Sequence, residues 1–264
     1  MQLPLSQVIA KRLLICDEAG STNDELVALS AEEPDFSVVV TANQTAGRGR
    51  LGRVWVAPAG SSLAISVLLR PALPDGEPLA MEHYGWLPLI AGAAMARALQ
   101  PLVAGRVALK WPNDVQIDGL KVCGVLAELL PSGDAVVMGS GVNLSMTRDE
   151  LPTATATSLA LAGASVGGDH LADAVLAGYL TELRSLIDDF LRHGASAEAS
   201  GTLGLVTDLC TTIGQQVRVE LPGGTDLFGA ATGIDKSGRL LLRRSTDGLA
   251  MAVAAGDVTH LRYE

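Results

Sequence analysis

Residues 47–55 read Gly-Arg-Gly-Arg-Leu-Gly-Arg-Val-Trp, and this segment limits the fold more than any other stretch of the chain. Its glycines match the Gly-x-Gly-x-x-Gly pattern of dinucleotide-binding loops and kinase glycine loops. A dinucleotide site needs a helix directly after the glycines and an acidic residue about 20 residues further on. Here Pro58, Gly60 and a strand-like run follow, and the chain has no His-Arg-Asp or Asp-Phe-Gly motif. The segment therefore argues against a Rossmann fold and against a protein kinase.

The chain is acidic, apolar and poor in aromatic residues. It has 264 residues and a formal net charge of −10, and 48% of its residues are hydrophobic, 18% charged and 3% aromatic. This length corresponds to about two domains or one large one. The hydrophobic content excludes intrinsic disorder. A general nucleic-acid surface needs clustered Lys and Arg, and a single-strand-binding surface needs stacking aromatics, so the composition argues against both.

The cysteines and apolar runs predict a soluble, cytoplasmic protein. Cys16, Cys123 and Cys210 are widely spaced and odd in number, so they form neither a disulfide framework nor a paired metal motif. The N-terminal residues lack the basic-then-apolar order of a signal peptide. The best candidate for a membrane span, residues 86–96, ends at Arg97 and is shorter than the ~20 residues that a span needs.

Hydrophobic patterning predicts strands and helices as far as about residue 212. Asp118-Gly119 is typical of a type I′ turn and predicts a hairpin between the strands on either side. Helices are expected from Ser21 or Thr22 to near Pro34, over 82–100, over 168–193, and in a further segment that ends before Thr211. Strands are expected at 11–16, 37–40, 62–69, 107–110, 115–117, 122–129, 135–138 and 142–144, with Gly139 and Gly141 separating the last two.

The pattern changes at about residue 213. Short β-rich runs alternate there with turn sequences such as Pro222-Gly223-Gly224 and Lys236-Ser237-Gly238. Strand–turn repetition over about 50 residues predicts a small β-barrel appended to an α+β domain.

Arg48, Arg50 and Arg53 lie among the glycines of residues 47–55 in a chain that is acidic overall. Glycines let backbone N–H groups approach an anion closely, and arginines add donors for phosphate or carboxylate. A solvated basic loop is the alternative. Because the segment lies between two buried strands and ends in Trp55, we favour a flexible loop that closes over a phosphorylated ligand.

Three further segments carry polar groups that a ligand could use. Gly20-Ser21-Thr22-Asn23 reads as a helix cap, yet its N–H groups and hydroxyls also suit a polar ligand head. Lys110-Trp111-Pro112-Asn113-Asp114 precedes Lys121, which is either an edge-strand lysine or a cation for the ligand, and Gly124 indicates a close approach. Asn143 lies in an apolar run, and its partners are either backbone groups or an adenine edge.

The chain resembles the biotin–protein ligases in five motifs and their order: GSTN, QTAGRGRLGRVW, KWPND, KVCGVLAE and GVN. The resemblance is strong over residues 20 to about 160 and weak over the terminal barrel. It implies an α+β fold with two domains. Residues 1–212 would form a biotin–lipoate ligase catalytic domain with a mixed sheet, similar to class II aminoacyl-tRNA synthetases, and residues 213–264 an SH3-like β-barrel.

The resemblance also implies an activity and its site. A carbon–nitrogen ligase would form biotinyl-5′-AMP from biotin and ATP, with Mg²⁺, and pass the biotinyl group to a lysine of a carboxylase's biotin carboxyl carrier domain. Arg48 and Lys121 are the expected catalytic residues, and the metal ligands are left unassigned. The expected biotin-binding residues are Ser21, Thr22, Asn23, Gln44, Gly47, Arg48, Gly49, Arg50, Lys121, Gly124, Leu126 and Gly139. The expected ATP-binding residues are Arg48, Arg50, Arg53, Trp55, Lys121, Asn143 and Arg262.

Partners other than the carrier domain are limited. About 20 residues precede the first motif, too few for the winged-helix domain of bifunctional members, so no DNA partner is expected. No membrane partner is expected, and a monomer and a weak dimer both remain open. The alternatives are a lipoate or octanoate ligase or transferase of the same fold, and a non-catalytic biotin-binding module, against which the intact Arg48 and Lys121 argue.

Overall fold

The computed structural model describes residues 1–221 and 223–261, which form two β-sheets, a short hairpin and several helices. The helices are α1 (Pro4–Ile9), α2 (Thr22–Leu29), α3 (Trp86–Leu99), α4 (Gly168–Arg192) and α5 (Thr202–Leu209), with 3₁₀ turns at Arg50–Gly52, Met81–His83 and Gln100–Leu102. The strands are β1 (Arg12–Cys16), β2 (Ser37–Thr41), β3 (Gly47–Arg48), β4 (Val54–Trp55), β5 (Ser62–Leu69), β6 (Val107–Lys110), β7 (Asp114–Ile117), β8 (Leu120–Leu129), β9 (Val136–Asn143), β10 (Gln216–Glu220), β11 (Asp226–Ile234), β12 (Leu240–Arg244), β13 (Ala250–Val253) and β14 (Asp257–His260).

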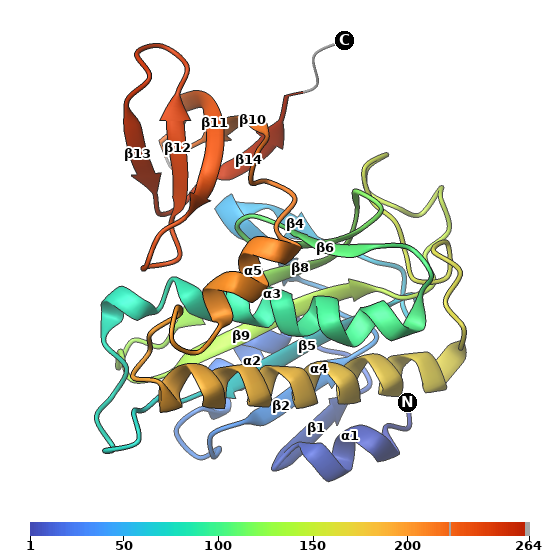
Figure 1. The fold of residues 1–264 in the computed structure, drawn as a ribbon. Helices are drawn as coiled ribbons and strands as arrows, with labels where there is room; N and C mark the ends of the chain where they lie inside the picture. The colour runs from blue at the N-terminus through green and yellow to red at the C-terminus, as the bar shows by residue number, and fades with distance from the viewer. Residues whose placement is uncertain (222, 262–264) are drawn as a thin grey trace.

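A mixed seven-stranded sheet forms the centre of the molecule, in the order β1-β2-β5-β9-β8-β7-β6. Strands β1 and β2 are parallel, and the other neighbouring pairs are antiparallel. Helices α3 and α4 lie across one face of this sheet (Figure 1). On the other face, Val39 of β2 packs with Leu26 of α2, whereas Val38 and Val40 belong to the larger core. Burial of both faces explains why β2 and β5 are buried at every position and mostly apolar.

A second, antiparallel sheet has the order β13-β12-β11-β10-β14. Two buried tryptophans of the first sheet's domain bind one of its turns: Trp86 Nε1 donates to Lys236 O (2.7 Å), and Trp111 Nε1 donates to Gly238 O (3.2 Å). The contact is close, because an added Cβ at Gly85 would lie 2.4 Å from Ser237 O. These contacts fix the C-terminal sheet against the main sheet, above it in Figure 1.

The α+β class, with a mixed sheet followed by a small C-terminal β-domain, is confirmed. The hairpin turn is confirmed too, because Asp118 and Gly119 have φ of 50° and 82°, as a type I′ turn requires. No helix within the described residues is long and apolar enough to cross a membrane.

Three elements differ from the sequence prediction. Helix α2 ends at Leu29 instead of near Pro34, because Ser30 hydrogen-bonds back to Val27 O with its N–H and its hydroxyl. Residues 136–143 form one strand, β9, instead of two. Helix α1 was not expected; Asp173 of α4 holds it by accepting hydrogen bonds from the first-turn N–H groups of Leu5 and Ser6.

Candidate active site

A cavity of about 370 Å³ is bounded by the N-terminus of α2, the β3–β4 hairpin, β8, β9, the loop around residues 152–156 and the start of β14. Many of the residues expected to bind biotin or ATP line it: Ser21, Thr22, Asn23, Gln44, Arg48, Gly49, Arg50, Arg53, Trp55, Lys121, Gly124, Leu126, Gly139 and Asn143. Gly47 packs beside the cavity, where an added Cβ would lie 2.3 Å from Gln44 Nε2. Arg262 lies outside the described residues.

The first turn of α2 forms an uncharged, polar end of the cavity. Ser21 caps the helix, and its hydroxyl accepts a backbone N–H at 3.4 Å. Thr22 donates its N–H (2.8 Å) and its hydroxyl (3.1 Å) to Gln44 Oε1. Ser66 of β5 is fully buried, and its hydroxyl lies 2.8 Å from Thr22 Oγ1 and 2.6 Å from Asn23 Oδ1. This end offers donors and acceptors without a formal charge, as a neutral polar ligand head needs.

The glycines of β9 make the wall beside this end flat. An added Cβ at Gly139 would lie 2.4 Å from Asn23 Oδ1, and one at Gly141 would lie 2.8 Å from the Trp55 ring. The side chains of Asn23 and Trp55 therefore rest directly on the β9 backbone. Their close approach explains why β9 runs straight through glycines that the sequence predicted to separate two strands.

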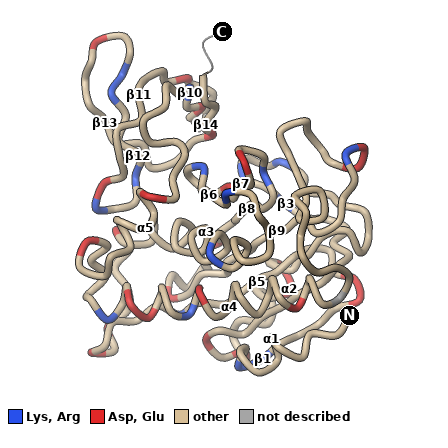
Figure 2. Tube along the Cα trace, turned by 45° about the vertical axis from the view of Figure 1, so that its right-hand side comes forward, with Lys and Arg blue, Asp and Glu red and all other residues tan. Residues whose placement is uncertain are grey.

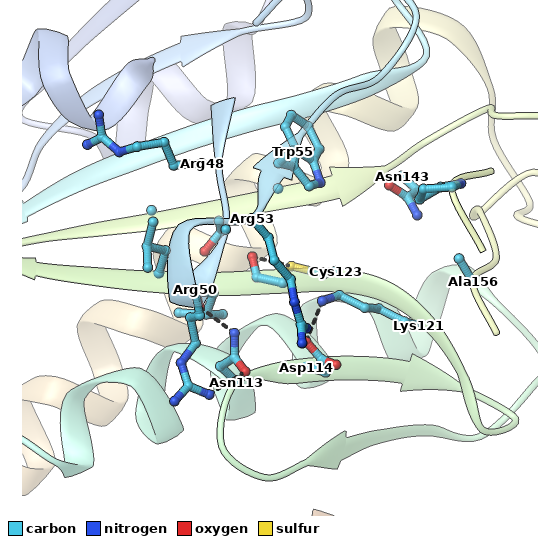
Figure 3. A pocket seen from close by; sticks show the side chains of 18 of the residues that line it. Arg48, Arg50, Arg53, Trp55, Asn113, Asp114, Lys121, Cys123, Asn143 and Ala156 are labelled. Atoms are coloured by element: carbon cyan, nitrogen blue, oxygen red, sulfur yellow. Dashed lines mark hydrogen bonds and ion pairs between the residues drawn. The ribbon is translucent and has the colours of Figure 1, made fainter. Parts of the chain in front are cut away.

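Arg48 is held by two carboxylates. Its guanidinium donates to Asp24 (2.5 and 2.6 Å) and to both oxygens of Glu128 (3.0 Å each). The hydrogen bonds to Asp24, and then those to Glu128, raise the pKa of Arg48 above its ordinary value. In Figure 3 its side chain extends away from Lys121. The segment forms a short hairpin, in which β3 pairs with β4.

The other two arginines of the hairpin reach the C-terminal sheet. Arg50 donates to Asn113 Oδ1 (3.1 Å) and to Gly256 O (3.2 Å), and burial lowers its pKa. Arg53 pairs with Asp257 at the start of β14, and this hydrogen bond raises the pKa of Arg53. The hairpin is therefore fastened both to the main sheet and to the C-terminal sheet.

Lys121 adds a cation from β8. Its ammonium lies 2.5 Å from Asp114 Oδ1, and 42% of its side chain is exposed, compared with 19% for Asp114. An added Cβ at Gly124 would lie 3.2 Å from Lys121 Nζ, so the glycine leaves the ammonium its space. The chain carries a net charge of −10, yet the cavity lining has five cations and two carboxylates. The cations are Arg48, Arg50, Arg53, Lys110 and Lys121, and the carboxylates are Asp114 and Asp257. Figure 2 shows blue segments around β3, β7 and β8. The lining therefore carries more cations than carboxylates, which favours an anionic ligand.

Asn143 and Cys123 complete the far wall. Asn143 Nδ2 donates to Thr157 O (2.9 Å), so one of its partners is a backbone group. The loop that carries Thr157 is attached to β8, because Lys121 N donates to Thr155 O (2.8 Å). Burial raises the pKa of Cys123 to about 12, so its thiol stays neutral and is not a nucleophile at physiological pH.

Several residues at the site were not in the expected biotin and ATP sets. Lys110 and Asn113 line the cavity and belong to the same motif as Asp114, so the motif itself was the available signal. Asp257, Ser66 and Glu128 had no such signal, because their hydrogen bonds join residues 43 to 204 positions apart. Among the side chains that the structure describes, no group of three His, Cys, Asp or Glu could hold a metal ion.

Comparisons with known proteins agree with this geometry. Residues 16–144 match the biotin/lipoate A/B protein ligase family, and residues 212–261 match the biotin protein ligase C-terminal domain. The chain is 36% identical to the biotin–[acetyl-CoA-carboxylase] ligase of Mycobacterium tuberculosis, over 96% of this chain and 90% of that protein. It is 31% identical to the bifunctional ligase/repressor BirA of Escherichia coli, over 97% and 76% of the two chains. The biotin protein ligase from Aquifex aeolicus in complex with biotin and ATP superimposes with a TM-score of 0.73 and 27% identity, over 96% and 100% of the two chains. The chain therefore belongs to the biotin–protein ligase family.

Proposed function

We propose that this protein activates biotin with ATP and transfers the biotinyl group to a lysine of a carboxylase's biotin carboxyl carrier domain. The observation that carries the proposal is a single cavity that joins an uncharged polar end, at the start of α2, to a cationic end, at the β3–β4 hairpin and Lys121. Biotin has the same polarity, with a neutral ureido head and a carboxylate at the end of an aliphatic chain. The names of the relatives and the biotin and ATP complex support the same activity.

In the first step, a carboxylate oxygen of biotin attacks the α-phosphorus of ATP, and the bond to pyrophosphate breaks. This reaction brings two anions together and concentrates negative charge on the phosphate in the transition state. Fixed cations stabilise such charge. The positions of Arg48, Arg50 and Lys121 around the cavity support assigning them this role, with Ser21, Thr22, Asn23 and Gln44 holding the ureido head. Asn143 would then contact the adenine with its remaining hydrogen-bonding capacity.

Mg²⁺ would accompany ATP. This ion binds proteins through one or two carboxylates and otherwise through phosphates and water. Asp114 and Asp257 are the two carboxylates of the lining, and they fit this limited demand.

We extend the proposal to the division of the chain into domains. Residues 1–212 would form the catalytic domain, and the β-domain would begin at residue 213. A cytoplasmic location remains a prediction.

In the second step, the carrier lysine attacks the acyl carbon of biotinyl-5′-AMP, and AMP leaves. The carrier needs a surface next to the cavity. Strand β7 pairs with β8 only as far as Gly124, and Val125 bonds to Asn113 O, so the described part of β8 beyond Val125 pairs with β9 alone. A second groove, of about 480 Å³, runs along this edge and shares Arg50 and Asn113 with the first cavity. An open edge accepts an added strand through backbone hydrogen bonds, which supports carrier docking here.

The test of the activation step is ATP–pyrophosphate exchange. Exchange is expected with biotin and absent without it or with lipoate in its place. Exchange that does not depend on biotin, or that lipoate supports equally, would contradict the proposal. For the docking edge, Ala127→Pro removes the next outward N–H of β8, so it should slow carrier labelling while leaving exchange intact. Equal labelling by this variant would place the docking surface elsewhere.

A further inference from the structure

We propose that Ser66 and Glu128 are positioning residues that fix Asn23 and Arg48, and so link the polar end of the cavity to the arginine hairpin; the inference rests on the function proposed above. Neither of these two described residues lines the cavity. Ser66 therefore acts through Asn23, and Glu128 acts through Asn23 and Arg48.

The two residues together define which way the Asn23 amide faces. Glu128 Oε1 lies 2.8 Å from Asn23 Nδ2. An ionised carboxylate only accepts hydrogen bonds, so the NH₂ end of the amide must face it. The carbonyl end then faces Ser66 Oγ at 2.6 Å and needs the hydroxyl proton of Ser66. An amide turned by half a rotation would place its oxygen against the carboxylate.

Packing prevents the Asn23 amide from changing its orientation. The residue is 5% exposed, Ser66 is fully buried, and Gly139 leaves no space beneath the amide. An amide held at both ends and from below is oriented before a ligand arrives, and such preorganisation lowers the entropic cost of binding. Removing the hydroxyl of Ser66 would leave the buried Asn23 oxygen without its donor.

Glu128 also binds the hairpin. Its Oε1 accepts from both Asn23 Nδ2 (2.8 Å) and an Arg48 NH2 nitrogen (3.0 Å). The side chain of Glu128 is 29% exposed, whereas that of Asp24, the other partner of Arg48, is 56% exposed. The pair with Glu128 is therefore less screened by solvent than the pair with Asp24. One carboxylate thus contacts both a group from α2 and a cation from β3, two elements that the pair between Arg48 and Asp24 also joins.

Three substitutions separate these roles. Ser66→Ala should weaken biotin binding about 10-fold, as expected for one buried hydrogen bond, and leave the exchange rate at saturating biotin nearly unchanged. Glu128→Gln keeps an oxygen for Asn23 but loses the charge that attracts Arg48. It should lower the exchange rate about 10-fold while the Kd for biotin stays within about two-fold. Glu128→Leu removes both contacts and should show both losses.

Matched controls exist in the chain. Ser37→Ala removes another fully buried strand hydroxyl, which bonds to Glu33, and Glu182→Gln removes the charge from another half-exposed ion pair, with Arg97. Both controls should keep wild-type Kd and rate. Calorimetry with biotin and the exchange assay on folded protein give the two readouts.

The pattern of losses decides the inference. Wild-type biotin binding in Ser66→Ala, or a wild-type rate in Glu128→Gln, would overturn it. Equal losses of biotin binding in Glu128→Gln and Glu128→Leu would show that the charge itself is needed to hold Asn23, so the two roles would not be separable, and this result would overturn the inference as well. If Glu128→Leu does not fold, the first two variants still decide. If the wild-type protein itself shows no biotin-dependent exchange, the proposed function fails first, and the failure is visible without any variant.

Discussion

Gly139→Ala tests the flat wall of the cavity most sharply. The added Cβ would lie 2.4 Å from Asn23 Oδ1 and 3.0 Å from Asn23 Cγ and Nδ2. Asn23 cannot move away without straining its hydrogen bonds to Ser66 (2.6 Å) and Glu128 (2.8 Å). One buried and one partly buried hydrogen bond at about 1 kcal/mol each, with about 1–2 kcal/mol of overpacking, predict a loss of about 3–4 kcal/mol in unfolding free energy.

The affinity for biotin should fall together with the stability of Gly139→Ala. Displacing Asn23 disturbs the polar end, so we expect the Kd for biotin to rise at least about 10-fold, which corresponds to 1.4 kcal/mol. Urea unfolding and calorimetry measure the two effects. Gly141→Ala is the matched control, because it adds the same methyl group two residues along β9 but meets Trp55 at 2.8 Å. Among the described residues, no hydrogen bond holds the Trp55 ring, whereas Asn23 is held at both ends of its amide, so the loss of stability should be smaller. Unchanged stability and affinity in Gly139→Ala would refute this reasoning.

Three further predictions concern the cations, the thiol and the hairpin. Lys121→Met should lower biotin-dependent exchange about 10²–10³-fold, as loss of a charge-stabilising donor does, and near-normal exchange would contradict its assignment. The Cys123 thiol stays protonated to about pH 12 when folded but ionises near its ordinary value of 9.0 when unfolded, so stability should fall as pH rises above about 9. In urea titrations at several pH values, Cys123→Ala should reduce the slope of the unfolding free energy against pH above about 9, whereas an unchanged slope would argue against the thiol as its source. Trypsin cleavage within residues 48–53 should slow when biotin and ATP are added, and equal cleavage with and without them would count against a closing hairpin.

Local patterns predicted much of the fold. The apolar runs of β2 and β5 and the Asp118-Gly119 turn can be read from neighbouring residues, because burial and backbone geometry act locally there. The glycines of β9 misled the prediction for a physical reason. A glycine in a strand marks either a break or a close approach, and here Asn23 and Trp55, from distant segments, make the approach.

The site was predictable to the extent that its motifs are contiguous. The arginines of the hairpin could be named, but their partners could not. Arg48 binds Glu128, 80 residues away, and Arg53 binds Asp257, 204 residues away. The sequence favoured a flexible loop because glycines and arginines alternate between two buried strands, and the acceptors of those arginines lie far away in the chain. The fold supplies those acceptors from α2, β8 and β14, and the segment forms a hairpin.

The most direct test of the account is transfer itself. The protein is incubated with ATP, Mg²⁺, biotin and an isolated biotin carboxyl carrier domain, and the carrier is analysed by intact-mass and peptide mass spectrometry. We predict one added biotinyl group on one lysine, dependent on ATP, absent when that lysine is replaced by arginine, and absent with lipoate in place of biotin. A carrier that remains unmodified by the folded, ATP-supplied protein, or one that is modified equally with lipoate, would contradict the account.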